Sequence, residues 1–133
     1  MKTRPMLTLE DCRKISAAAE AEAKKNKWNV CIAILDDGGH LLHLARMDGA
    51  SPANARIAIE KGRTAAESRR STAVWQERIK TRPELLRMPE ITPIQGGLPI
   101  VVEGTCVGAV GISGVQSHED EQIAAAGIKA VAG

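Results

Sequence analysis

Residues 32–47 read IAILDDGGHLLHLARM and predict a β-hairpin that sets the fold class of the chain. An apolar strand over residues 29–35 leads into Asp36-Asp37-Gly38-Gly39, whose residues tolerate positive φ and let the chain reverse. The next strand, residues 40–47, is expected to pair antiparallel with the first. Because residues 30–35 are all apolar, both faces of the first strand should be covered by other layers.

Strand alternation divides the side chains of residues 40–47 between two faces. One face is predicted to carry His40, Leu42, Leu44 and Arg46, and the other Leu41, His43, Ala45 and Met47. The two histidines therefore cannot share a pocket. On this prediction His40 and Arg46 lie on one face, which is expected to meet the glycine-rich strand 107–114 or a neighbouring subunit.

The remaining elements follow the hairpin on both sides. Thr8 is expected to cap a helix over residues 9–26, and Ser51-Pro52 to start one that reaches about residue 70. A mid-helix Gly62 suggests a close approach by another element. Further segments are predicted as a short helix to residue 79, an irregular loop or lid over 82–99, a second hairpin over 98–102 and 105–113, and a last helix over 117–131.

This order of elements, without a linker or repeat, predicts a single α+β domain over residues 1–133. Helices should cover both faces of an antiparallel sheet, in an α/β/α three-layer arrangement.

Composition narrows the possible functions. The 133 residues carry 18 basic and 16 acidic side chains, two Trp, and neither Phe nor Tyr. Base stacking on aromatic side chains and attraction to anionic membranes are both disfavoured, so no nucleic acid or membrane partner is expected. Three widely spaced cysteines, and the lack of a signal peptide or a long apolar run, favour the cytoplasm.

Several side chains are candidates for ligand binding. His40 and His118 can ligate a metal or transfer a proton, and Arg46 can bind a carboxylate through two hydrogen bonds. The turns around Gly96-Gly97 and Ser113 offer backbone N–H groups near a helix start, where anions bind. Solvated histidines and purely structural turns explain the same residues, and both readings stay open at this stage.

Four motifs together resemble one known family. The chain contains LDDGGHLLHLARMDGA (residues 35–50), KGRTAA (61–66), GGLPI (96–100) and VGAVGISG (107–114), followed by Asp120-Glu121. In this order they resemble the GlcG/HbpS family, which also occurs as the C-terminal domain of the corrinoid adenosyltransferase PduO. The resemblance implies a profilin-like fold with a five-stranded antiparallel sheet, and a homo-oligomer between dimer and octamer.

The resemblance also implies a ligand, because several family members bind haem. His40, the histidine of the GGH motif, is the first choice for an axial ligand of haem iron. The leading hypothesis is therefore a protein that binds haem or a small acidic ligand, as an accessory to a catabolic or haem-related pathway. The alternative is a small cofactor-independent lyase or isomerase of aromatic or diol degradation, in which a histidine or Asp120 is the acid or base and arginines bind a carboxylated intermediate.

Overall fold

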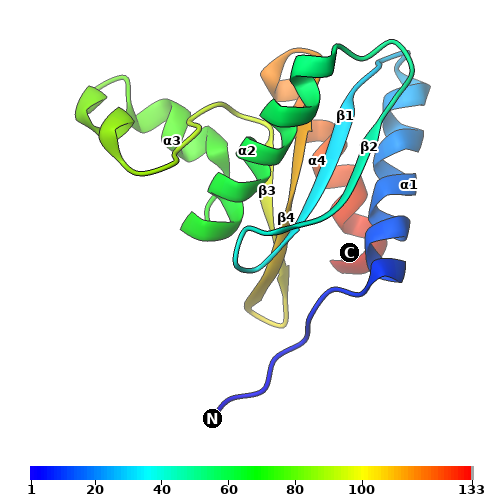
Figure 1. Cartoon of the computed structure of the whole chain (residues 1–133), viewed down its shortest axis with the longest axis horizontal. Helices are drawn as coiled ribbons and strands as arrows, with labels where there is room; N and C mark the ends of the chain where they lie inside the picture. Colours follow the sequence, from blue (N-terminus) through cyan, green and yellow to red (C-terminus); the bar gives the residue numbers. More distant parts are fainter. Residues whose placement is uncertain (133) are drawn as a thin grey trace.

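A computed structural model of the chain describes residues 1–132 (Figure 1). Its elements follow in the order α1 (Leu9–Lys25), β1 (Cys31–Asp36), β2 (Leu41–Arg46), α2 (Pro52–Ser68), α3 (Thr72–Arg78), the 3-10 helix η1 (Pro83–Arg87), β3 (Gly97–Val102), β4 (Thr105–Ser113) and α4 (Ser117–Ala132). None of the helices in these residues has the length and apolarity that crossing a bilayer requires.

The sheet has four strands in residues 1–132, in the order β2-β1-β4-β3, and every neighbouring pair is antiparallel. The expectation of five strands, which came from the family resemblance, is wrong. The segment between α3 and β3 contains η1 and prolines 83, 89 and 93, and proline cannot donate to a strand ladder. Pro99 is part of β3, an edge strand where proline is tolerated, so the predicted loop ends earlier than expected.

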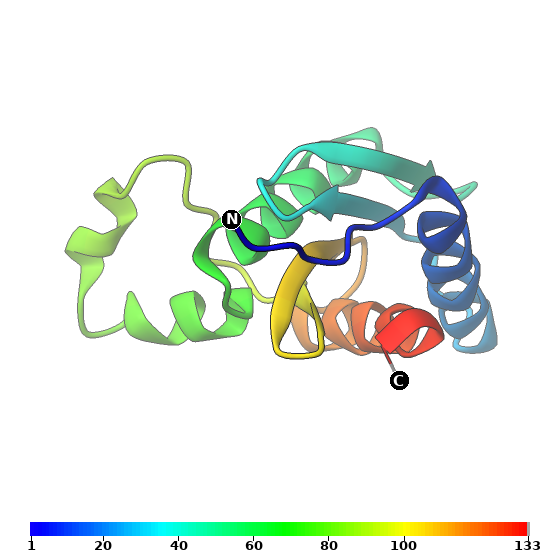
Figure 2. The ribbon, with the colours of Figure 1, turned by 90° about the horizontal axis from the view of Figure 1, so that it is seen from below.

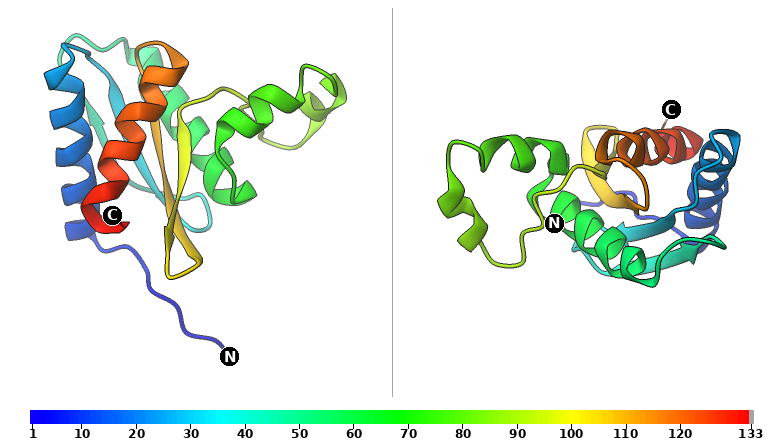
Figure 3. Two further views of the ribbon diagram at one scale, coloured as in Figure 1. Left: turned by 180° about the vertical axis from the view of Figure 1, so that it is seen from behind. Right: turned by 90° about the horizontal axis from the view of Figure 1, so that it is seen from above.

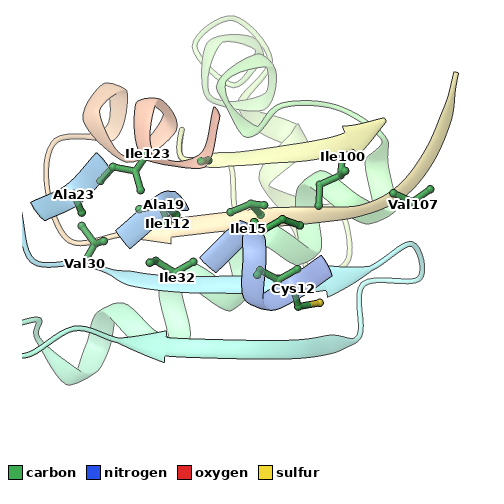
Figure 4. Packing of buried hydrophobic residues seen from close by; sticks show 13 residues of the cluster. Cys12, Ile15, Ala19, Ala23, Val30, Ile32, Ile100, Val107, Ile112 and Ile123 are labelled. Carbon is green, nitrogen blue, oxygen red and sulfur yellow. The ribbon is translucent and has the colours of Figure 1, made fainter. Parts of the chain in front are cut away.

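Helices cover both faces of the sheet, as the uniformly apolar β1 predicts. Helices α1 and α4 lie side by side on one face, and α2 lies on the other (Figures 1 and 3). Figure 4 shows the larger core, where Ile15 of α1 and Ile123 of α4 meet Ile32 and Ile112 of the sheet. On the opposite face, Cys31, Ala33 and Leu35 of β1 pack against Ala58 of α2.

A glycine contact brings α2 directly onto the backbone of β4. A Cβ atom on Gly111 would collide with the carbonyl oxygen of Ala58 and the amide nitrogen of Gly62. A Cβ atom on Gly62 would instead collide with the Cδ1 methyl group of Leu35. The close approach predicted from Gly62 is confirmed, and it explains why this helix tolerates a residue of poor helix propensity.

Residues 72–95 form an arm that projects from the body of the molecule (Figure 2). Backbone N–H groups at its return end are held by side chains: Thr92 donates to Thr64 Oγ1 at 2.9 Å, and Gln95 donates to Gln76 Oε1 at 2.8 Å. The Trp75 indole donates to Ser68 Oγ at 2.9 Å. The arm is thus a fixed extension built on α3 and η1.

Substitution of Gly111 by Ala is expected to destabilise the protein by about 1–3 kcal/mol, because the added methyl group meets backbone atoms that cannot rotate away. Gly62→Ala should cost less, since a rotation of Leu35 relieves its collision and alanine favours the helix. Urea unfolding of both variants tests this order. A Gly111→Ala protein as stable as the native one would contradict the proposed packing.

Candidate functional site

His40 lies in the β1–β2 turn, one residue before β2 begins, with its side chain 82% exposed. One carboxylate oxygen, Asp36 Oδ1, accepts the backbone N–H groups of Gly38 and His40, each at 2.9 Å. The same oxygen lies 3.3 Å from the ring nitrogen Nδ1 of His40. The other ring nitrogen, Nε2, has no protein partner among the described residues. The turn therefore presents one imidazole to solvent and holds it from one side.

Arginines from two other segments converge on the same turn. Arg69, the C-cap of α2, donates to the carbonyl oxygens of Asp37 and Ala66 and lies 3.6 Å from Cys106 Sγ on β4. Arg4 of the N-terminal segment forms an ion pair with the Asp37 carboxylate. These contacts fix the turn against the body of the protein.

The predicted alignment of His40 with Arg46 on one face is wrong. The β1–β2 register shifts between Ile34 and Leu35, so that Leu41 pairs with Leu35 and shares the side of Leu44 and Arg46. This bulge interrupts the alternation before it reaches His40. Arg46 pairs with Cys31 at the opposite end of the strand, five residues or about 17 Å from Leu41.

Arg46 is exposed at that far end. It lines a recess of about 300 Å³ together with Glu20, Lys24, Asn29, Met47 and Asp48. His40 and Arg46 of one chain thus belong to different places on the surface.

The candidates Gly96, Gly97 and Asp120 are brought together, but around a buried lysine. Lys61 Nζ lies 2.9 Å from Asp120 Oδ2 and donates to the carbonyl oxygen of Ile112 at 3.1 Å. The side chains of Lys61 and Asp120 are 3% and 2% exposed. A Cβ atom on Gly96 would lie 2.9 Å from Lys61 Nζ, so the glycine leaves room for the lysine.

Gly97 and Asp120 have hydrogen-bond partners within the protein. The Gly97 N–H donates to Thr72 Oγ1 at 2.9 Å, and Asp120 Oδ1 accepts the Val115 N–H at 3.1 Å. Burial raises the pKa of the Asp120 carboxyl in spite of the neighbouring Lys61. Gly97 therefore has no N–H to offer an anion, and Asp120 lies beneath the surface instead of in an open pocket.

The other candidates lie apart from His40. Ser113 Oγ donates to Asn54 Oδ1 at 2.8 Å, close to the start of α2, and His118 is exposed on the first turn of α4. His43 pairs with Ile34 on the face that α1 and α4 cover, and its buried Nδ1 has no hydrogen-bond partner in residues 1–132. None of these side chains adds to the group around His40.

Sequence reasoning missed two residues that organise these sites. Lys61 occurs at the core spacing of α2, between the buried Ala58 and Ala65, and a lysine at such a position indicates a buried partner. The sequence predicts Asp36 only as a turn former, and the available signal for its further role is that aspartate at the start of a turn commonly accepts backbone N–H groups.

Fold and site together define a small α+β protein with one histidine held at a hairpin turn. The chain belongs to the HbpS-like family: the family model described as "Haem degrading protein HbpS-like" matches residues 7–129. It is 46% identical over 114 residues to protein GlcG of Escherichia coli K12, with 85% of each chain covered.

Solved structures agree with this assignment. A double mutant of HbpS from Streptomyces reticuli matches with a TM-score of 0.91 and 31% identity, covering 98% of this chain and 90% of that one. A PduOC:heme complex, at 23% identity, shares the fold with a TM-score of 0.87 and 96% of each chain covered.

Replacing Lys61 by Met is expected to cost about 3–5 kcal/mol of unfolding free energy, because it leaves the Asp120 carboxylate buried without a counter-charge. The double variant Lys61→Met/Asp120→Leu should recover most of this loss, since no charge then remains in the core. Urea unfolding at pH 7 measures both. Equal losses in the single and double variants would show that the cost comes from lost packing alone.

The pH dependence of stability provides a second test of the same prediction, with the double variant as the control. In Lys61→Met the raised pKa of the Asp120 carboxyl means that the native state binds this proton more tightly than the unfolded state, so stability relative to the double variant should rise as the pH falls from neutral toward the unfolded pKa of about 3.9. The double variant lacks the carboxyl and should show no such rise.

Proposed function

We propose that this protein binds haem at the β1–β2 turn, where His40 Nε2 would hold the iron. The observation that carries the proposal is the geometry of the turn: Asp36 lies against Nδ1, and Nε2 is open to solvent. Haem iron needs one or two ligands from the protein, because the ring nitrogens occupy its other positions.

The donor set of the chain is consistent with haem. In residues 1–132 no three His, Cys, Asp or Glu side chains form a group that could hold a bare metal ion. A single exposed imidazole can supply the one protein ligand that haem iron needs, but not the several ligands that a free metal ion needs. When bound, haem supplies redox chemistry that the side chains of this site lack.

Apolar surface for the porphyrin lies next to His40. Leu41 and Leu42 follow it directly and are 45% and 40% exposed. Arg63 of α2 lies near the turn as well, since its Cγ would be 3.1 Å from a Cβ atom on Gly39. The leucines would contact the ring in a chain that has neither Phe nor Tyr. Arg63, which also pairs with Glu60, would bind a propionate group.

The family supports the same proposal. The HbpS-like family is described as haem degrading, and the chain matches it over nearly its whole length.

The three cysteines are free thiols, which fits a reducing compartment such as the cytoplasm.

We further propose that Arg46 binds a carboxylate group in its own recess, separately from His40.

We also propose that the protein is a homo-oligomer that uses the β2 and α2 surface. Leu41, Leu44 and Ile57 are exposed on this side of the sheet. Ile57 lines a hollow of about 710 Å³ on α2 together with other apolar residues and with Arg56, Glu60 and Arg63. A second copy seated here would bury the leucines and enclose a ligand held at His40.

Titration of the apoprotein with haemin is expected to produce a Soret shift that saturates at one haem per chain. His40→Ala should weaken binding about tenfold or more, because the iron loses its protein ligand. His118→Ala, which removes an exposed histidine elsewhere, is the matched control and should bind as the native protein does. Native-like binding by His40→Ala would refute the proposal.

Leu44→Glu is expected to convert the oligomer to a smaller species, because it places a charge in the buried interface. The measurement is molar mass by light scattering after gel filtration. Val101→Glu on the opposite edge strand, where the native side chain is 49% exposed, should leave the mass unchanged. A monomeric native protein, or equal effects of both variants, would argue against this interface.

A further inference from the structure

We propose that Asp36 is a positioning residue for His40: it keeps the proton of the neutral imidazole on Nδ1 and so leaves the lone pair of Nε2 directed to solvent. The consequence for haem rests on the proposed function, whereas the tautomer is a property of the protein without ligand.

The position of the Asp36 carboxylate is determined by the backbone. It is the last residue of β1, paired with Gly108 of β4, and its own N–H donates to the carbonyl oxygen of His40 at 2.8 Å. Its Oδ1 atom receives two further N–H groups, from Gly38 and His40, at 2.9 Å each. The backbone contacts therefore hold the carboxylate in place independently of the imidazole.

The imidazole is the more exposed partner of the two. The side chain of Asp36 is 34% exposed, against 82% for His40. Burial acts to raise the pKa of Asp36, but the N–H groups of His40 and Gly38, together with the imidazole itself, lower it below its usual value. The carboxylate thus stays ionised and accepts hydrogen bonds across the physiological range.

A fixed, ionised carboxylate determines which ring nitrogen carries the proton. It can only accept, so the nitrogen that faces it at 3.3 Å is favoured as N–H. In metal sites the same arrangement of carboxylate and histidine orients the ring and makes the ligating nitrogen more basic.

Two other acidic side chains, Asp37 and Glu67, lie near the turn. The Asp37 carboxylate pairs with Arg4. Glu67 Oε1 lies beside Gly39, 2.9 Å from where a Cβ atom would be. Among the described residues, Asp36 alone has a carboxylate oxygen in contact with a ring nitrogen of His40.

The test is NMR of the ¹⁵N-labelled apoprotein at a pH where His40 is neutral, because ring nitrogen shifts distinguish the two tautomers. The native protein should show a protonated Nδ1 and an unprotonated Nε2 on His40. Asp36→Ala should move the proton toward Nε2, and Asp37→Ala, the neighbouring carboxylate, should leave the native pattern. A native His40 protonated on Nε2, or no change in Asp36→Ala, would overturn the inference.

Asp36→Asn is the control for disruption of the turn in Asp36→Ala, because the amide oxygen of asparagine can still accept the two backbone N–H groups. It should retain a weakened preference for the Nδ1 proton, between the native protein and Asp36→Ala. An Asn variant with a native turn and the tautomer ratio of free histidine would also overturn the inference.

Haemin titration of the same variants separates this inference from the proposed function. If both are correct, Asp36→Ala binds haemin about tenfold more weakly than the native protein, as expected for loss of a ligand-orienting group. If the tautomer changes but haemin affinity does not, Asp36 positions His40 and the haem proposal fails instead.

Discussion

The buried ion pair between Lys61 and Asp120 joins the two layers of helices that the sheet otherwise separates. Lys61 belongs to α2 on one face and Asp120 to α4 on the other, and the ammonium group also binds the carbonyl oxygen of Ile112 at the end of β4. A buried charge requires a partner at close distance, so the pair fixes how the two helices lie relative to each other. Glycines at positions 96 and 97 leave room for Lys61 at the start of β3, because a Cβ atom on either would collide with it, whereas Gly111 lets the backbone of α2 approach β4.

The surface site has the opposite character. The β1–β2 turn is held by hydrogen bonds to the Asp36 carboxylate and by contacts of Arg69 and Arg4 with Asp37, while its histidine stays exposed. Rigid placement of an exposed imidazole is useful for binding, since less freedom is lost when a ligand arrives. The exposed leucines of β2 extend the same surface toward α2, which is why ligand binding and self-association are proposed for neighbouring parts of the molecule.

Local patterns were sufficient for most of the fold. Thr8 caps α1 with Asp11 in a capping box, and α2 begins at Pro52 directly after Ser51, both within a residue or two of the predicted boundaries. The apolar β1 correctly indicated helices on both faces. The family motifs led to the right family, but the strand number borrowed from the resemblance did not apply to this chain.

The sequence by itself determined the elements, the two hairpins and the turn that carries His40, because capping, alternation and glycine turns act between residues close in the chain. Only the tertiary structure decided which candidates meet. A one-residue bulge separated His40 from the face of Arg46, and the partners of Lys61 lie 51 and 59 residues away. Neither a bulge nor a long-range ion pair leaves a local signal, since each depends on packing between segments that the sequence does not place side by side.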